Sequence, residues 1–66
     1  MTVFYSLRNT RTGRYLSYDD DETSDINEMF TPYELFAAEA ALKLLTESGR
    51  CVGKFVIVRW EVTTLD

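Results

Sequence analysis

The carboxylates are the residues of this chain whose type and spacing suggest chemistry. From Tyr15 to Leu42 the sequence contains eight acids and no base, and six of these acids fall within residues 19–28. The eight are Asp19, Asp20, Asp21, Glu22, Asp25, Glu28, Glu34 and Glu39. Carboxylates in this number suit three tasks: cation binding, acid–base catalysis, and the attraction of a basic partner.

The spacing of the acids argues against a calcium site. An EF-hand loop that begins at Asp19 has Ser24 where glycine is required and Phe30 where a bidentate glutamate is required. Loops that begin one or two residues later also lack the final glutamate. The single Cys51 excludes an internal disulfide and a multi-cysteine zinc site, and a structural or incidental role is favoured for it over a reactive one. We expect no dedicated metal site and no cofactor.

Catalysis is disfavoured by what the chain lacks. It contains no histidine, so acid–base chemistry near neutral pH would need a carboxylic acid with a strongly raised pKa inside an enclosed cleft. A chain of 66 residues has little volume for such a cleft. Gly13, Gly49 and Gly53 are spaced as turn or cap residues, not as a phosphate-binding loop. We therefore expect a protein that is not an enzyme.

The charge is unevenly distributed along the chain. The net charge of −4 is the sum of −8 from residues 15–42 and +4 from the other residues, which carry all seven bases and three acids. The negative total disfavours nonspecific binding to nucleic acid or to an anionic membrane. Two interpretations of the acidic segment stay open: it keeps a small protein in solution, or it binds in the basic nucleic-acid groove of another protein.

A basic hairpin is the second candidate surface. Arg8, Arg11 and Arg14 lie in the sequence among tyrosines, which are Tyr5 before them and Tyr15 and Tyr18 after them. Arginines with exposed aromatic rings are typical of single-strand nucleic-acid binding. The simpler interpretation is a hairpin with half-buried tyrosines and solvated arginines, and it is favoured because the acidic segment that follows would repel phosphates.

Four segments must position these side chains. Residues 3–18 are predicted to form a hairpin around the turn residues Asn9 to Gly13, with Val3, Tyr5 and Leu7 on one face. Residues 19–30 are predicted to be an exposed acidic loop, because Asp and Ser are poor residues for helix and strand interiors.

A helix is predicted over about residues 32–48. Its apolar stripe consists of Leu35, Ala38, Leu42 and Leu45, and Gly49 is suited to cap its C-terminus. A capping box at Thr31-Pro32-Tyr33-Glu34 favours the early start, and the alternative is a start near Ala37.

A strand is predicted over about residues 54–63. The residues expected to form its core face are Val56, Val58, Trp60 and Val62, with Trp60 as the anchor. We expect this strand to lie beside the first strand in the centre of the sheet, in a direction that the sequence leaves open. The predicted fold is α+β: a single β-β-α-β domain over residues 1–66, with one helix packed on a mostly antiparallel three-stranded sheet.

Short patterns in three of these segments resemble a group of known proteins. Arg8-Asn9-x-x-Thr12-Gly13-x-Tyr15-Leu16, Leu35-Phe36-Ala37-x-x-Ala40 and Phe55-Val56-Ile57-Val58 are similar to patterns in small uncharacterised proteins of bacteriophages and mobile elements. The long Asp-rich insertion after the hairpin departs from their usual form. By size and charge the chain also resembles anti-CRISPR and other host-takeover inhibitors. The resemblance implies a non-enzymatic protein in the cytoplasm of a bacterial host, where it blocks a large nucleic-acid machine.

The functional expectation follows from the charge and from this resemblance. We expect an acidic inhibitor that binds a host nucleic-acid-handling protein, in its most specific form an anti-CRISPR DNA mimic that blocks target-DNA binding by a CRISPR effector. The alternatives are a homodimer or interaction module that uses a strand edge or Trp60, and a single-strand nucleic-acid binder that uses residues 8–18. No membrane partner is expected, because the longest apolar run, residues 55–58, is far too short to span a bilayer.

Overall fold

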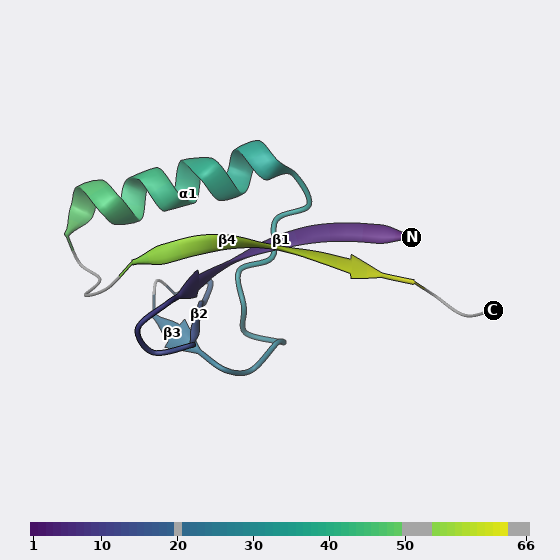
Figure 1. The fold of residues 1–66 in the computed structure, drawn as a ribbon, viewed down its shortest axis with the longest axis horizontal. Coiled ribbons are helices and arrows are strands. Elements are labelled where there is room, and N and C mark those ends of the chain that lie inside the picture. The colour runs from purple at the N-terminus through teal and green to yellow at the C-terminus, as the bar shows by residue number, and fades with distance from the viewer. Residues whose placement is uncertain (20, 50–53, 64–66) are drawn as a thin grey trace.

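The computed structural model describes residues 1–19, 21–49 and 54–63. In chain order the elements are β1 (Thr2–Asn9), β2 (Tyr15–Leu16), β3 (Glu22–Thr23), α1 (Leu35–Ser48) and β4 (Phe55–Val62). The strands form one antiparallel sheet in the order β3-β2-β1-β4, and α1 packs on β1 and β4 (Figure 1). The α+β class with one helix on an antiparallel sheet is confirmed. The sheet has four strands, not three, because residues 22–23 of the expected loop pair with β2.

Strands β1 and β4 form the longest pairing in the fold. Every residue of each strand has a partner in the other, from Thr2 opposite Val62 to Asn9 opposite Phe55. The prediction that the last strand lies beside the first is confirmed, and the two strands run antiparallel. The expected central position of the last strand is wrong, because β1 is flanked on both sides and β4 lies at the edge.

The core lies between α1 and one face of the β1–β4 pair. Buried Leu7, Leu16 and Phe55 form its centre, against which further apolar side chains pack, namely Phe30, Ala41, Leu42, Leu45 and Ile57. The expected core face of the last strand is therefore wrong, because the helix covers the odd-numbered residues. Residues 55–58 are apolar on both faces, so only the contact with α1 decides which face is buried deepest.

The opposite face of the sheet carries a second aromatic cluster. Trp60 stacks on Phe4 with ring centroids 5.9 Å apart and an interplanar angle of 7°. The Tyr15 ring is tilted by 54° against the Trp60 ring, with centroids also 5.9 Å apart. The Trp60 indole N–H donates to Ser6 Oγ at 2.7 Å, and Ser6 is fully buried. Trp60 thus ties β4 to β1 on the face away from the helix, and it is not part of the core cluster in which it was expected as the anchor.

The helix begins at Leu35, between the two predicted starts. Its N-cap is Glu34, in an extended conformation with no side-chain cap hydrogen bond, so the predicted capping box is not formed. The Pro32 carbonyl instead accepts from the Tyr5 N–H at 2.9 Å, which holds the approach to the helix in a sheet-like path. The predicted C-cap is confirmed, since Gly49 adopts a left-handed conformation with φ of 65°.

The predicted hairpin is confirmed, with a shorter second strand. Its loop closes through the Gly13 N–H to the Asn9 carbonyl at 2.8 Å, and Gly13 has φ of 77°. The buried Asn9 side chain accepts from the Arg11 N–H at 2.9 Å. β2 ends at Leu16, and Ser17 continues its path with an isolated antiparallel bridge to Met29 before the chain turns.

Candidate functional site

The acidic loop, residues 19–30, is tied to the edge of the sheet at both ends. Tyr15 pairs with Thr23 and Leu16 pairs with Glu22 through β2 and β3. The far end returns to the same strand, where the Phe30 N–H donates to the Leu16 carbonyl at 2.8 Å. Figure 1 shows β3 and the segment after it on one side of the β1–β4 ribbon and α1 on the other.

Local side-chain hydrogen bonds shape the chain on both sides of β3. Ser17 Oγ accepts from the backbone N–H groups of Asp19 and Asp21, at 3.3 and 3.2 Å. Asp21 accepts from the Glu22 N–H at 2.8 Å, and Asp25 accepts from the Asn27 N–H at 2.9 Å. Short polar side chains that bond to nearby backbone are what makes such a segment a turn. Two of the acids therefore have a structural role as well as a charge.

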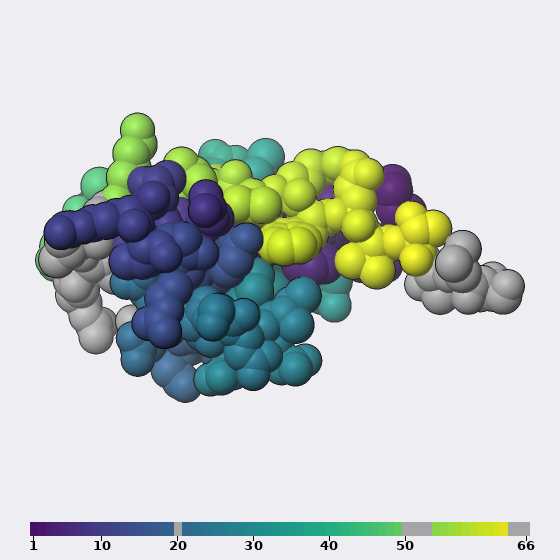
Figure 2. All heavy atoms as spheres, turned by 60° about the horizontal axis from the view of Figure 1, so that its bottom comes forward, coloured from purple at the N-terminus to yellow at the C-terminus, as the bar shows by residue number. Residues whose placement is uncertain are grey.

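Apolar side chains of the loop face both inward and outward. Met29 is buried, and Phe30 makes an edge-to-face contact with Tyr18, with ring centroids 5.6 Å apart. Two apolar side chains are left open to solvent, Tyr18 at 65% and Ile26 at 56% exposure. Figure 2 shows the loop as a projecting part of the surface beside the hairpin. The loop thus presents apolar contact area among its carboxylates.

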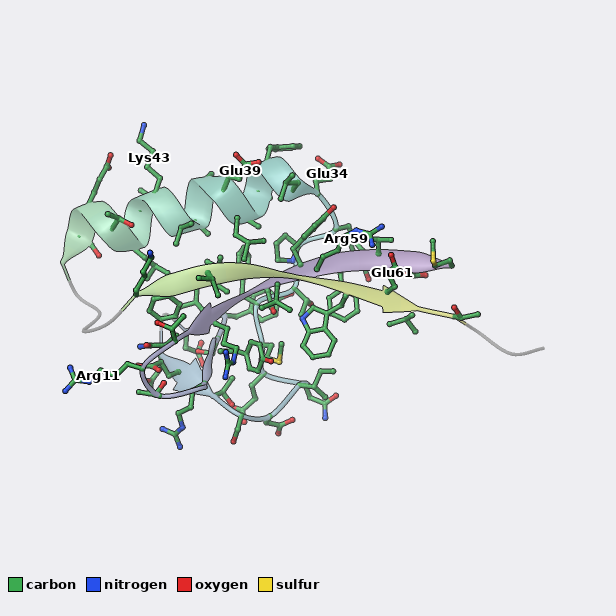
Figure 3. All side chains as sticks on the ribbon, in the orientation of Figure 1. Arg11, Glu34, Glu39, Lys43, Arg59 and Glu61 are labelled. Atoms are coloured by element: carbon green, nitrogen blue, oxygen red, sulfur yellow. The ribbon has the colours of Figure 1, made fainter. Side chains whose placement is uncertain are left out.

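The structure divides the eight predicted binding acids into groups. Those exposed on the acidic loop are Asp19, Asp21, Asp25 and Glu28. Glu22 is half-buried and accepts from the Thr12 hydroxyl at 2.6 Å, and Asp20 lies outside the described residues. Glu34, the N-cap of α1, and Glu39, on α1 itself, lie on the other side of the β1–β4 pair (Figure 3).

The two acidic groups have different electrostatic surroundings. Glu39 is one helical turn from Lys43, so the charge on α1 is partly balanced. The acidic loop has no base of its own, although the Thr12–Glu22 bond brings the hairpin loop with Arg11 and Arg14 alongside β3. The segregation of acids from bases is therefore sharper along the sequence than it is in space.

The basic hairpin does not assemble the surface that its sequence suggests. Arg8, Arg11 and Arg14 are exposed. Tyr5 lies on the helix face of the sheet and Tyr15 on the opposite face, against Trp60. The tyrosines thus serve packing on two different faces, and they do not form one stacking platform beside the arginines.

The outer face of α1 carries an apolar stripe that the sequence interpretation missed. Phe36 and Leu44 are 70% and 67% exposed, and exposed Ala40 lies between them. Their i, i+4, i+8 spacing was visible in the sequence, but the inward stripe offered a sufficient account of the helix. The helix is consequently apolar on two opposite sides, and the sheet covers one of them.

Two classes of site receive no support from the described residues. Among residues 1–19, 21–49 and 54–63, no three side chains of the metal-binding types are placed to hold one ion. The described helix is too short and too polar to cross a membrane. Cys51 lies outside the described part of the chain. Comparison with protein-family models, curated proteins and solved structures finds no match to this chain.

Proposed function

We propose that this protein is a non-enzymatic inhibitor that docks its acidic loop in the basic nucleic-acid groove of a host protein. One observation carries the proposal: exposed carboxylates and the exposed side chains of Tyr18 and Ile26 stand together in residues 18–28, a segment that contains no base. The loop is tied to β2 at both ends, so the backbone that carries its carboxylates is held in place before a partner arrives. A pre-ordered surface loses less conformational entropy on binding than a flexible tail.

The charges and the apolar side chains have different tasks in this proposal. Carboxylates of one sign attract a basic groove over a distance and raise the association rate, in a way that salt screens. Affinity in protein interfaces comes mainly from buried aromatic and apolar side chains, and tyrosine is prominent among them. Ile26 on the loop and Tyr18 directly before it are the exposed large apolar side chains open to this use.

In its most specific form the proposal is an anti-CRISPR protein that blocks target-DNA binding by a CRISPR effector. The resemblance in size and charge to host-takeover inhibitors motivates this choice of target. The direct measurement is the retention of labelled target DNA by a purified effector complex as this protein is added. Displacement of the DNA supports the specific form, and unchanged DNA binding removes it.

The wider proposal is tested by capture from a bacterial lysate with a matched pair of variants. The loop variant is Asp19→Lys with Glu28→Lys, two carboxylates that bond to no described side chain. The control is Glu34→Lys with Glu39→Lys, which changes the net charge equally on α1. We expect wild type and control to capture nucleic-acid-binding proteins that added DNA releases, and the loop variant to lose them. Equal capture by both variants would contradict the proposal, provided that circular dichroism shows both folded.

A further inference from the structure

The hydrogen-bond pattern of β1 identifies which backbone groups of β4 are open. The Asn9 N–H donates to Arg14, next to β2, whereas the Thr10 N–H donates to Lys54, next to β4. Backbone groups of successive strand residues point to opposite edges, so even-numbered residues of β1 face β4. Their partners are the even-numbered residues of β4. The residues of β4 that turn their N–H and C=O groups to the open edge are therefore Phe55, Ile57, Arg59 and Glu61.

This open edge lacks the usual protection against pairing. β4 is eight residues long and contains no proline or glycine, and no described strand lies on its outer side. Short strands, prolines, bulges and charges are the devices that keep an edge from pairing. Only the charges are present here, as Arg59 and Glu61, which form an ion pair along the strand.

The C-terminal half of β4 is also free of the helix. α1 covers Phe55 and Ile57, whereas Arg59 and Glu61 are exposed. Figures 1 and 3 show β4 continuing past the N-terminal end of α1, with both charged residues on that part. In Figure 2 the same half of the strand lies at the surface, so neither the helix nor the acidic loop covers it.

Charge selects one register for pairing with a second copy of this strand. In such a pair, the odd-numbered residues, whose backbone N–H and C=O groups point to the open edge, must lie opposite odd-numbered residues of the second copy. The two-fold axis therefore passes through the position of one residue of β4. An axis at Arg59 sets two arginines opposite each other. An axis at Val58 sets Arg59 opposite Ile57 and Glu61 opposite Phe55. An axis at Trp60 sets Arg59 opposite Glu61 twice, and directly opposed unlike charges stabilise a sheet.

We infer that this protein forms a homodimer in which the two β4 strands pair antiparallel about a two-fold axis at Trp60. The four-stranded sheet then continues into that of the second copy, with α1 of each copy at an end away from the axis. The two Trp60 residues form the pair on the axis, on the face that α1 leaves open, with their Cα atoms about 4.5 Å apart. Val58 faces Val62 of the other copy, which covers a side chain that is 45% exposed in one chain.

The inference concerns other residues than the acidic loop, so it stands or falls separately from the proposed function. Its first test is a charge exchange, read by sedimentation equilibrium. We expect wild type to have twice the mass of one chain. Arg59→Glu and Glu61→Arg should each raise the dimer dissociation constant by about tenfold or more, because each sets like charges opposite each other twice. The double exchange should return the dissociation constant to the wild-type value. Lys43→Glu, which places the charge change of Arg59→Glu on α1, should leave the dissociation constant unchanged.

A second measurement is independent of mutation. Hydrogen exchange of the Arg59 and Glu61 amides should slow as the protein concentration rises, because these N–H groups bond only in the dimer. The Val58 and Trp60 amides should stay protected at every concentration, because they bond to β1. A wild-type monomer at millimolar concentration, a double exchange that fails to restore the dimer, or fast exchange at Arg59 and Glu61 throughout would each overturn the inference.

Discussion

The acidic loop and the C-terminal half of β4 are two exposed surfaces that differ in electrostatic character. The loop carries carboxylates alone, whereas the strand carries one arginine and one glutamate two residues apart. A surface with charges of a single sign repels its own copy and requires a foreign partner of the other sign. A surface with both signs can match its own copy once a two-fold axis reverses their order.

The two surfaces are also held in place by different interactions. Side chains of the loop itself bond to nearby backbone, as in Ser17 with Asp19 and Asp21. β4 is held by its pairing with β1, a strand more than forty residues away in the sequence, and by the contact between Trp60 and Phe4. Damage to the core should therefore reach β4 first, and local changes in the loop should leave the sheet intact.

The largest effect is expected for Leu7→Ala, which would remove both surfaces at once. Leu7 is fully buried between the sheet and α1. Its truncation should lower the free energy of unfolding by about 2–5 kcal/mol, a large fraction of the stability of a small domain. Urea unfolding, monitored by circular dichroism, measures the free energy of unfolding. Leu44→Ala, at a residue 67% exposed, is the control and should change stability by less than about 1 kcal/mol. Equal effects at the two leucines would place the core elsewhere.

Measuring partner binding and self-association in both charge variants should show that the two surfaces act independently. Asp19→Lys with Glu28→Lys should weaken binding to a basic partner by about tenfold or more and leave self-association unchanged. Arg59→Glu should do the reverse. Both quantities are measured at two salt concentrations, and the loop interaction should have the steeper salt dependence because its charges are of one sign. If one variant altered both quantities, the two surfaces would be a single interface.

Ser6→Ala tests how much the hydrogen bond to Trp60 contributes to holding β4 in place. The variant removes the acceptor of the Trp60 indole N–H and should lower the free energy of unfolding by about 1 kcal/mol. The fluorescence of the sole tryptophan reports the change at the site. Ser24→Ala, an exposed serine of the loop, is the control and should have little effect on either readout. An unchanged tryptophan environment in Ser6→Ala would mean that this hydrogen bond does not position the indole.

The smallest effect is expected for Glu34→Ser, and it is a gain. Glu34 occupies the N-cap in a suitable extended conformation but makes no side-chain cap hydrogen bond. A serine there can accept from the first turn of α1 and should raise stability by about 0.5–1 kcal/mol. Glu39→Ser removes the same charge inside the helix and should not stabilise. Because Glu34 lies apart from the acidic loop, partner binding should be unchanged in both variants.

Local chemistry made several elements predictable. The hairpin turn depends on Asn9 and Gly13, and the end of the helix depends on Gly49, whose left-handed conformation is readily available to glycine. The inward stripe of the helix was also predictable for Ala38, Leu42 and Leu45, because a regular spacing of good helix formers marks it. Leu35 was expected in the same stripe but is 46% exposed, since it lies in the first turn.

Other features were beyond local chemistry because they depend on a distant partner. The start of α1 moved to Leu35 because Pro32 is engaged by Tyr5 from β1. The short strand β3 has no apolar residue and is defined by its pairing with β2. The acids and their division between a loop and the helix region were predicted from the sequence, yet their placement on opposite sides of the β1–β4 pair follows from the path of the chain around the sheet.

By itself the sequence determined the sign of the acidic segment, the hairpin, the end of the helix and the presence of a strand at residues 55–62. These follow from residue types and short spacings, since turn, cap and helix preferences act within a few residues. Only the tertiary structure decided which face of β4 meets the helix, that β4 is an edge strand, and which of its backbone groups are open. Residues 55–58 are apolar on both faces, so their burial was settled by the register with β1 and by the position of α1.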